Sequence, residues 1–313
     1  MRRENGSVLV VDDMYHTIQP LLAVLGLSVD YKPEISREQI LQTLDQYTGL
    51  IIRSKTSVDQ ELIDCGTSLK FVARAGAGID KLDIDYLKSK DIAIFNAPEG
   101  NRDALGEHTL GMLLAILHKI ASACNQVRLG IWEREANRGV ELGSLTVGVY
   151  GVGHMGHSFA VKLSGLGCRV IGYDKYKTNY SNEFIQETDI DEFIAETEVL
   201  SIHLPLSDES RQLFSYDYLQ SFPKLKIVLN TSRGGVVSTE GILKLLEENE
   251  LEGAGLDVLE NEKINSYSDQ ERSVLDRLLG HPNVLITPHV AGWTKESYHR
   301  INEVLVKKIS TLF

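Results

Sequence analysis

The chain has 313 residues, of which 42% are hydrophobic, and its formal net charge is −12 at pH 7. This length is sufficient for two ordinary domains with full cores, and the composition argues against a disordered chain. The acidic balance argues against a nucleic-acid-binding protein or a peripheral membrane protein, because both usually carry basic faces, so a small-molecule partner is expected.

The cysteines and the N-terminal residues indicate the cellular compartment in which the protein is expected. Cys65, Cys124 and Cys168 are far apart and lack metal-ligand spacing, which favours reduced thiols and no metal site. The start of the chain, MRRENGS, is positively charged, but the apolar run behind it stops at Asp12 and Asp13. No apolar segment approaches the roughly 20 residues of a membrane span. We therefore expect a soluble, cytoplasmic protein.

Short apolar runs rich in β-branched residues alternate with segments of helical period, a pattern typical of doubly wound parallel sheets. In the first third, the pattern predicts a helix at 38–47 and strands at 7–13, 27–31, 50–54, 70–76 and 92–98. A second series predicts strands at 145–151, 168–174, 198–205, 226–232, 252–258 and 283–289. The predicted fold class is α/β, with two doubly wound parallel-sheet units.

Two further helical segments indicate the domain organisation. Residues 101–128 form a long helical pattern with a wide apolar face, and we expect this helix to cross from one unit to the other. The amphipathic segment 294–313 has no strand of its own to cover, so we expect it to pack on the first unit. The predicted domains are a substrate domain, residues 1–100 with 288–313, and a cofactor domain, residues 101–287.

Three glycines, Gly151, Gly153 and Gly156, have G-x-G-x-x-G spacing between a predicted strand and a predicted helix, and the next strand ends in Asp174. This order is the dinucleotide-binding fingerprint. The glycines make a tight turn, admit the pyrophosphate and let helix and strand pack closely, while the helix N-terminus binds the phosphates. Asp174 should accept hydrogen bonds from the ribose hydroxyls and repel a 2′-phosphate, which favours NAD over NADP, although Lys175 and Lys177 could accommodate such a phosphate.

Three polar residues follow later strands of the second series, namely Arg233, Glu262 and His289. Since the carboxyl ends of parallel strands meet at one edge of a sheet, we expect these side chains to converge. Beside a nicotinamide they fit hydride transfer to a 2-keto acid. The arginine would grip the carboxylate, the histidine would exchange a proton with the carbonyl oxygen, and the glutamate would orient the histidine. Glu260 remains the alternative to Glu262, because both stand in an acidic loop.

Together these motifs resemble the D-isomer-specific 2-hydroxyacid dehydrogenase family. The matching segments are RAGAGID, NAPEGNRDALGEHT, GVGHMG with Asp174, IHLPLSDES, LNTSRGG, GAGLDVLENE and LITPHVAGWT, which cover nearly the whole chain. The resemblance implies that Arg233, Glu262 and His289 are catalytic and that Asp257 contacts the nicotinamide end. Lys263 departs from the proline that usually follows the glutamate in this family.

The same resemblance implies an architecture and a cofactor site. A Rossmann NAD-binding domain would be inserted in a flavodoxin-like substrate domain, and a homodimer would form through the NAD-binding domain. The residues expected to bind NAD are Gly151, Val152, Gly153, His154, Met155, Gly156, Tyr173, Asp174, His203, Leu204, Pro205, Ser210, Thr231, Ser232, Asp257 and Gly292.

The first unit is expected to supply the rest of the substrate site. Backbone N–H groups in the glycine turn at 75–78 could bind a carboxylate as an anion nest, and Arg53 and Lys55 add positive charge at a strand end. A solvated surface pair is the alternative for these two cations. The predicted substrate-binding residues are Arg53, Ser54, Lys55, Ala75, Gly76, Ala77 and Gly78.

The charge in the first unit would suit a phosphorylated acid, and IIRSKT at 51–56 resembles D-3-phosphoglycerate dehydrogenases, here in a short form without a C-terminal regulatory domain. The leading prediction is therefore oxidation of 3-phosphoglycerate to 3-phosphohydroxypyruvate, in serine synthesis. A glyoxylate or hydroxypyruvate reductase is the unphosphorylated alternative, and PHVAGWT also resembles the erythronate-4-phosphate branch. Formate dehydrogenases pair the histidine with glutamine, so Glu262 argues against them. From another class, an NAD-sensing corepressor that binds protein partners remains an alternative.

Overall fold

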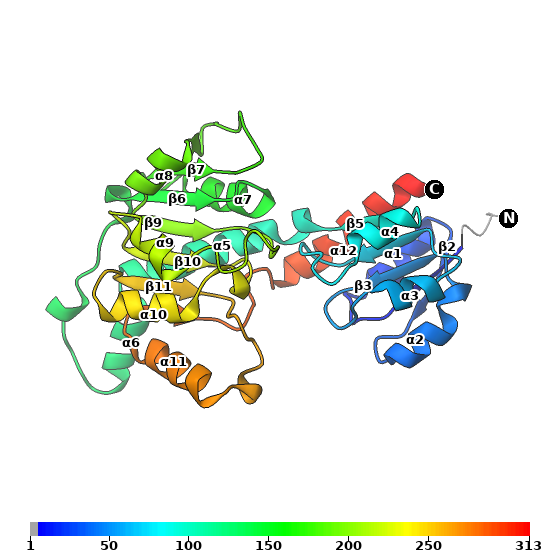
Figure 1. The fold of residues 1–313 in the computed structure, drawn as a ribbon, viewed down its shortest axis with the longest axis horizontal. Coiled ribbons are helices and arrows are strands. Elements are labelled where there is room, and N and C mark those ends of the chain that lie inside the picture. Colours follow the sequence, from blue (N-terminus) through cyan, green and yellow to red (C-terminus); the bar gives the residue numbers. More distant parts are fainter. Residues whose placement is uncertain (1–5) are drawn as a thin grey trace. The chain divides into compact units, whose positions relative to one another are not determined.

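The computed structural model describes residues 6–313, which form two compact units (Figure 1). Among the described residues, unit 1 comprises 6–102 and 293–313, and unit 2 comprises 103–292. These limits differ from the sequence-based limits at 100/101 and 287/288. The later second limit has a physical cause, because the backbone N–H groups of Val290 and Ala291 donate to Asp257 of unit 2. His289 therefore belongs to unit 2.

Unit 1 is built on a five-stranded parallel sheet in the order β2-β1-β3-β4-β5, the flavodoxin-like order. The strands are β1 (Gly6–Val10), β2 (Leu27–Tyr31), β3 (Gly49–Ile52), β4 (Phe71–Arg74) and β5 (Ala93–Asn96). The helices are α1 (Ile18–Val24), α2 (Arg37–Thr43), α3 (Gln60–Cys65), α4 (Ile84–Ser89) and α12 (Lys295–Ile309). As expected, the terminal helix packs on this unit, since Ile301, Leu305 and Ile309 of α12 are buried in one core with Val8 and Phe71.

Unit 2 is built on a seven-stranded parallel sheet in the order β12-β11-β10-β9-β6-β7-β8. The strands are β6 (Thr146–Tyr150), β7 (Arg169–Tyr173), β8 (Gln186–Glu187), β9 (Val199–Ile202), β10 (Ile227–Asn230), β11 (Gly253–Leu256) and β12 (Val284–Ile286). From β8 to β11 the sheet has the Rossmann order 3-2-1-4-5-6, and β12 extends it. The central strands β9, β10 and β11 are buried along their whole length, which explains their continuous apolar runs. The predicted fold class is confirmed.

The helices of unit 2 cover its sheet. They are α7 (His154–Leu163), α8 (Ile190–Glu196), α9 (Tyr216–Gln220), α10 (Thr239–Glu247) and α11 (Asp269–Gly280), and α5 (Pro98–Leu117) and α6 (Ile120–Arg128) precede them. The long helix predicted at 101–128 is broken, because Lys119 adopts a left-handed conformation with φ +52°. No single helix among residues 6–313 is long and apolar enough to span a membrane; α5 and α6 pass that test only as a pair bent by 61°.

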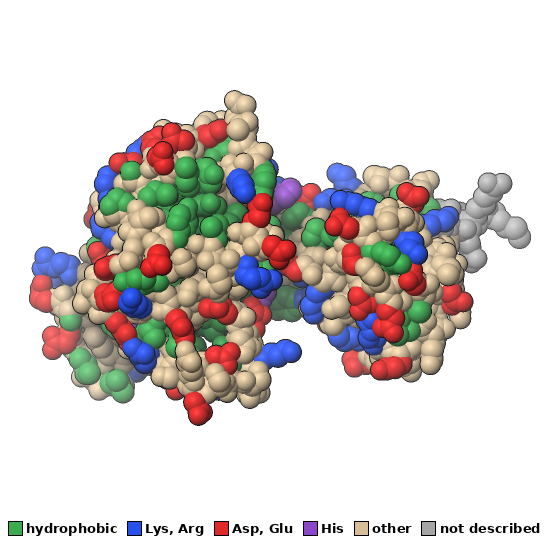
Figure 2. Space-filling view, viewed as in Figure 1, with side chains coloured by type: hydrophobic (Ala, Val, Ile, Leu, Met, Phe, Trp, Pro, Cys, Tyr) green, Lys and Arg blue, Asp and Glu red, His purple; other side chains and the backbone are tan. Residues whose placement is uncertain are grey.

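The surface of both units carries mixed charge. In the view of Figure 2, acidic and basic side chains are interspersed over each unit. The face shown has no extended basic patch of the kind that nucleic-acid-binding proteins use.

Candidate active site

The glycine-rich turn joins β6 to α7 at the carboxyl end of the unit 2 sheet. Gly151 has φ +92°, and a Cβ there would lie 2.7 Å from the carbonyl oxygen of His203. A Cβ at Gly156 would lie 2.1 Å from the carbonyl oxygen of Gly151, so helix and strand pack too closely for any side chain. Gly153 has extended backbone, and nothing lies within 4 Å of its Cβ position. The turn therefore fits a dinucleotide, with open space at Gly153 where the pyrophosphate would approach.

Asp174 follows β7 and organises the turn beside the glycines. One carboxylate oxygen accepts the backbone N–H of Val152 at 2.9 Å, and the other accepts those of Tyr176 and Lys177, each at 3.0 Å. Because a carboxylate offers about four acceptor positions, Asp174 retains capacity for a ribose hydroxyl. His154 and Met155, also predicted to bind NAD, are the first residues of α7.

His203 follows β9 and is partly buried beside the glycine turn. Its Nε2 lies 2.8 Å from the hydroxyl of Ser201, and its Nδ1 has no hydrogen-bond partner among the described residues. Burial lowers the pKa of His203 to about 3. The ring is therefore neutral at physiological pH and keeps an unused polar atom near the predicted cofactor.

The remaining predicted cofactor residues lie along the same edge of the sheet. Ser210 is buried and donates to the carbonyl oxygen of Pro205 at 2.6 Å, which shapes the turn after β9. Thr231 is buried with its hydroxyl 3.0 Å from that of Thr109 on α5. Tyr173 ends β7, Leu204 follows His203, and Gly292 is the last residue of unit 2.

Arg233 stands at the end of the turn that follows β10. The buried side chain of Asn230 accepts the backbone N–H and the hydroxyl of Ser232 at 3.0 and 2.8 Å. Its amide donates to the carbonyl oxygen of Arg233 at 3.0 Å. Asn230 therefore fixes this turn internally, and the turn presents Arg233 at the carboxyl edge of the sheet.

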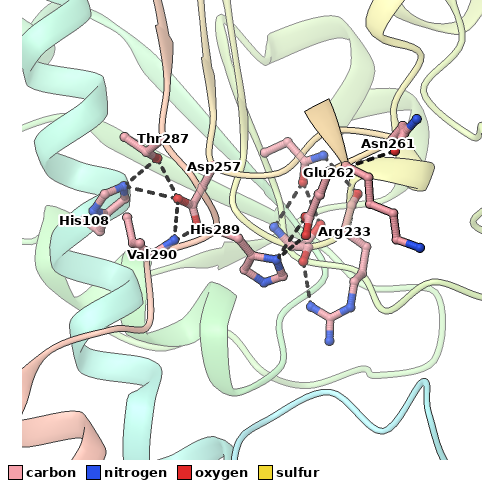
Figure 3. Close-up of polar contacts among 12 residues, drawn as sticks. His108, Arg233, Asp257, Asn261, Glu262, Thr287, His289 and Val290 are labelled. Atoms are coloured by element: carbon pink, nitrogen blue, oxygen red, sulfur yellow. Dashed lines mark hydrogen bonds and ion pairs between the residues drawn. The ribbon is translucent and has the colours of Figure 1, made fainter. Parts of the chain in front are cut away.

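His289 and Glu262 form a hydrogen-bonded pair at the same edge (Figure 3). The Nδ1 atom of His289 lies 2.9 and 3.1 Å from the two carboxylate oxygens, and both side chains are about half exposed. Since Nδ1 faces the carboxylate, Nε2 is the nitrogen available for proton exchange with a substrate. Arg233, Glu262 and His289 follow three neighbouring strands, β10, β11 and β12.

Glu260, the alternative to Glu262, has other partners. One of its oxygens accepts the backbone N–H of Thr239 at 2.7 Å, and the other accepts the amide of Gln212 at 2.6 Å. The lysine that follows Glu262 donates its backbone N–H to the side chain of Asn261 at 3.0 Å, so this loop is ordered without the proline usual in the family. The geometry selects Glu262 as the partner of His289.

Asp257 is buried beneath the loop that carries His289. Its carboxylate accepts the hydroxyl of Thr287 at 2.6 Å and the backbone N–H groups of Val290 and Ala291 at 2.9 and 2.8 Å. Its carbonyl oxygen accepts the N–H of His289 at 2.8 Å. The structure therefore places Asp257 as a support of this loop, whereas the family resemblance assigned it to the nicotinamide.

His108 on α5 extends this network and is absent from the sequence-based predictions (Figure 3). Its Nε2 lies 3.1 Å from the hydroxyl of Thr287 and 3.7 Å from the carboxylate of Asp257. A histidine inside a helical pattern carries no local signal of a partner far along the chain. Only its place in the segment NAPEGNRDALGEHT could have drawn attention to it.

In unit 1, Arg53 follows β3 and is held by aromatic rings. Its guanidinium lies 3.7 Å from the ring centre of Trp293 and 4.8 Å from that of Tyr298. Burial lowers the pKa of Arg53, although an arginine remains charged at neutral pH. The backbone N–H groups of Arg53 and Ser54 both donate to the carboxylate of Asp12. Arg53 is thus a positioned cation, and Trp293, which holds it, was not predicted.

Lys55 has a different environment. Its ammonium donates to the carbonyl oxygens of Pro33 and Ile35 at 2.5 and 3.0 Å, and so ties the segment after β2 to the end of β3. Two of its three donors are used in this way. Of the two predicted cations, Arg53 is therefore the better candidate for binding an anion.

The glycine turn after β4 is only partly available as an anion nest. Gly76 has φ +144°, and its N–H donates to the carbonyl oxygen of Arg74 at 2.9 Å. Ala75 donates to the carbonyl of β3. No acceptor within residues 6–313 is found for the N–H groups of Ala77 and Gly78, so these two remain as candidate donors to an anion.

Comparison with known proteins identifies the family. Residues 110–291 match the family model described as D-isomer specific 2-hydroxyacid dehydrogenase, NAD binding domain. This match covers more than half of the chain and falls within unit 2. The chain belongs to this family. The predicted cofactor, NAD, is thereby confirmed, and the glycine turn and Asp174 are the parts of unit 2 that fit it.

Individual relatives are consistent with this assignment. A D-3-phosphoglycerate dehydrogenase from Archaeoglobus fulgidus is 31% identical over 97% of this chain and 56% of the relative. A hydroxypyruvate reductase from Thermotoga maritima is 31% identical over 88% of each chain. This chain spans about half the length of the D-3-phosphoglycerate dehydrogenases that it matches. The structure of a D-lactate dehydrogenase from Aquifex aeolicus, complexed with NAD and lactic acid, is 25% identical, with a TM-score of 0.81 over 98% of this chain and 95% of that chain.

Proposed function

We propose that the chain is an NAD-dependent dehydrogenase that acts on the CH–OH group of a D-2-hydroxy acid. The observation that carries this proposal is the His289–Glu262 pair, 2.9 Å apart at the edge of the sheet whose β6–α7 turn fits a dinucleotide. An acid–base histidine oriented by a carboxylate is the arrangement that reversible oxidation of an alcohol requires.

Each catalytic side chain has one role in this proposal. The guanidinium of Arg233 binds the substrate carboxylate through two parallel hydrogen bonds. His289 takes the proton from the substrate hydroxyl as the hydride leaves the carbon that bears this hydroxyl. In the reverse direction it returns the proton to the carbonyl oxygen. Glu262 orients the imidazole and stabilises its protonated form. NAD, when bound, supplies the hydride acceptor.

The proposed substrate is 3-phosphoglycerate, which would be oxidised to 3-phosphohydroxypyruvate in serine synthesis. Arg53 supports this choice, because its guanidinium lies against the rings of Trp293 and Tyr298 and so provides a positioned charge for a phosphate. The D-3-phosphoglycerate dehydrogenases among the relatives support it as well. The second candidate is a hydroxypyruvate reductase, which the Thermotoga maritima relative favours because the match covers 88% of both chains.

The test is NADH oxidation with 3-phosphohydroxypyruvate, hydroxypyruvate and glyoxylate, compared in the wild type, Arg53→Ala and Lys55→Ala. We expect the phosphorylated acid to be preferred at least tenfold in kcat/KM, and Arg53→Ala to remove that preference. Lys55→Ala is the matched control and should keep it. A preference for hydroxypyruvate that Arg53→Ala leaves unchanged would support the second candidate, and no turnover with any acid would support a binding protein without catalysis.

The proposed quaternary structure is a homodimer formed through unit 2. Large apolar side chains are exposed on α6 and the loop that follows it, namely Ile120, Val127, Leu129, Ile131, Trp132 and Val140. Exposed large apolar side chains are enriched at protein interfaces, and a second copy of the chain is the partner that we propose. Light scattering should give a dimer for the wild type and a monomer for Leu129→Glu/Trp132→Glu.

A further inference from the structure

Lys175 and Glu209 form an ion pair beside the glycine-rich turn of unit 2. Lys175 follows Asp174 after β7, whereas Glu209 lies in the turn after β9. The ammonium of Lys175 is 2.9 Å from the carboxylate of Glu209, and the hydroxyl of Tyr176 donates to the same carboxylate oxygen. Strands β7 and β9 are the two neighbours of β6 in the sheet, so this pair links the two turns that flank the glycines.

This pair bears on the choice between NAD and NADP, which differ only by a phosphate on the 2′-oxygen of the adenosine ribose. The acidic residue at the end of the second strand of the fold contacts that ribose, and a cation nearby accommodates the phosphate. Here the acidic residue is Asp174, and two cations follow it, Lys175 and Lys177. Their presence alone would weaken the selection against NADP.

Both lysines have partners within unit 2. The ammonium of Lys177 donates to the carbonyl oxygen of Val152 in the glycine turn at 3.1 Å, and Lys175 is paired with Glu209. The formal charges of the two lysines are balanced by Asp174 and Glu209. Loss of Glu209 would leave an excess of one positive charge and free the ammonium of Lys175.

We propose that Glu209 is a specificity-determining residue for the coenzyme. It engages Lys175 and Tyr176 and adds a second carboxylate beside the ribose site. A 2′-phosphate would have to displace this carboxylate or lie next to it, and both cost binding energy because like charges repel. The ribose hydroxyls of NAD meet no such obstacle.

The same geometry predicts that variants at this pair will fold. The side chains of Lys175 and Glu209 are 56% and 62% exposed, and exposed ion pairs contribute little to stability. The charges of this pair should affect the binding of a phosphate, which carries nearly two negative charges, more than they affect protein stability. We expect the relative affinity for a 2′-phosphorylated ligand to change about fivefold to tenfold.

The test is Glu209→Gln, which keeps the size of the side chain and removes its charge. Calorimetric affinities for 2′,5′-ADP and for 5′-AMP, which differ only by the 2′-phosphate, need no substrate or turnover and are therefore independent of the proposed reaction. We expect the affinity ratio to shift about fivefold to tenfold towards 2′,5′-ADP, with the affinity for 5′-AMP unchanged within about twofold. The kcat/KM ratio of NADPH to NADH should shift in the same direction.

Two controls distinguish the effect of the Lys175–Glu209 pair from that of a general change in local charge. Asp208→Asn removes the same charge from the adjacent exposed residue, and no hydrogen bond from Asp208 to Lys175 is present in the described part of the chain; it should leave the ratio within about twofold. In a Lys175→Met background, Glu209→Gln should shift the ratio less than in the wild type, because only the direct repulsion between the carboxylate and the phosphate is then removed. An unchanged ratio in Glu209→Gln, an equal shift in Asp208→Asn, or a full shift without Lys175 would overturn the proposal.

Discussion

The backbone N–H of His289 donates to the carbonyl oxygen of Asp257 at 2.8 Å, while the side chain of Asp257 holds the two residues that follow His289. His289 has φ +55°, a conformation that costs a residue other than glycine of order 1–3 kcal/mol. Hydrogen bonds to one buried residue offset that cost. The position of the imidazole is therefore set from beneath by Asp257 and from the side by Glu262.

Asp257→Asn tests this support. An amide has only one acceptor oxygen, so the NH2 group of the asparagine would face a backbone N–H. We therefore expect the free energy of unfolding to fall by about 2 kcal/mol. The value of kcat should fall about 10- to 100-fold while the affinity for NADH changes little, because the imidazole is misplaced. Urea unfolding and stopped-flow NADH binding would measure both. Loss of NADH affinity with normal kcat would instead identify Asp257 as a nicotinamide contact.

His289→Ala should lower kcat by at least ~100-fold with nearly unchanged NADH binding, since general acid–base catalysis contributes roughly 10²–10⁴-fold. His299→Ala is the matched control, because His299 is also partly exposed but lies on α12 of unit 1. A parallel loss of cofactor affinity in His289→Ala would contradict the assigned role.

The glycines of the β6–α7 turn should respond differently to alanine. Gly153→Ala adds a methyl group where nothing lies within 4 Å, so the protein should fold normally but bind NADH at least ~10-fold more weakly, because the pyrophosphate needs that space. Gly156→Ala places the methyl group 2.1 Å from a backbone oxygen and should destabilise unit 2 by several kcal/mol, of the order of an overpacked core. Thermal unfolding and NADH fluorescence would distinguish them. Equal behaviour of the two variants would argue against this division of roles.

The lowered pKa of His203 predicts a protein that loses stability in acid. Its pKa is about 3 in the folded protein and 6.5 in the unfolded chain, so between these values the unfolded chain binds more protons. The free energy of unfolding should therefore fall as the pH drops from 6.5 towards 3, by at most about 1.4 kcal/mol per pH unit from this group. His203→Gln lacks this contribution, so urea unfolding at pH 7 and pH 5 should show a smaller decline for the variant. Identical declines would show that the histidine is not buried as a neutral ring.

Trp293→Ala should remove the cation–π contact that positions the Arg53 guanidinium. A cation–π contact contributes about 0.5–2 kcal/mol, so we expect KM for the phosphorylated acid to rise severalfold with little change in kcat. Trp293→Phe should restore part of the affinity, because it keeps an aromatic face. A change in kcat alone, with KM unaltered, would separate Trp293 from substrate binding.

The features that could be predicted from the sequence are those marked by a local pattern of residues. Every predicted strand is present, because β-branched apolar runs are a local signal, but β8 was missed since a strand of two residues, Gln186–Glu187, has no measurable period. The break at Lys119 was missed because neither glycine nor proline marks it.

The side-chain partners were harder to predict. The sequence placed Arg233, Glu262 and His289 at strand ends and favoured Glu262, but Glu260, two residues earlier, remained the alternative. It also could not show that Lys55 bonds Pro33 and Ile35, or that Asp257 faces the loop after β12. These contacts join segments that are distant in the chain, and only the folded structure brings them together.

The discontinuous nature of unit 1 has a consequence for synthesis on the ribosome. Helix α12 supplies Ile301, Leu305 and Ile309 to a core that otherwise consists of residues from the first hundred. That core cannot close until all of unit 2 has been translated, whereas unit 2 is continuous and can complete its sheet earlier. The usual order of domain folding during translation, N-terminal unit first, is therefore reversed, and one apolar face of the nascent first sheet must wait with only α1 covering part of it.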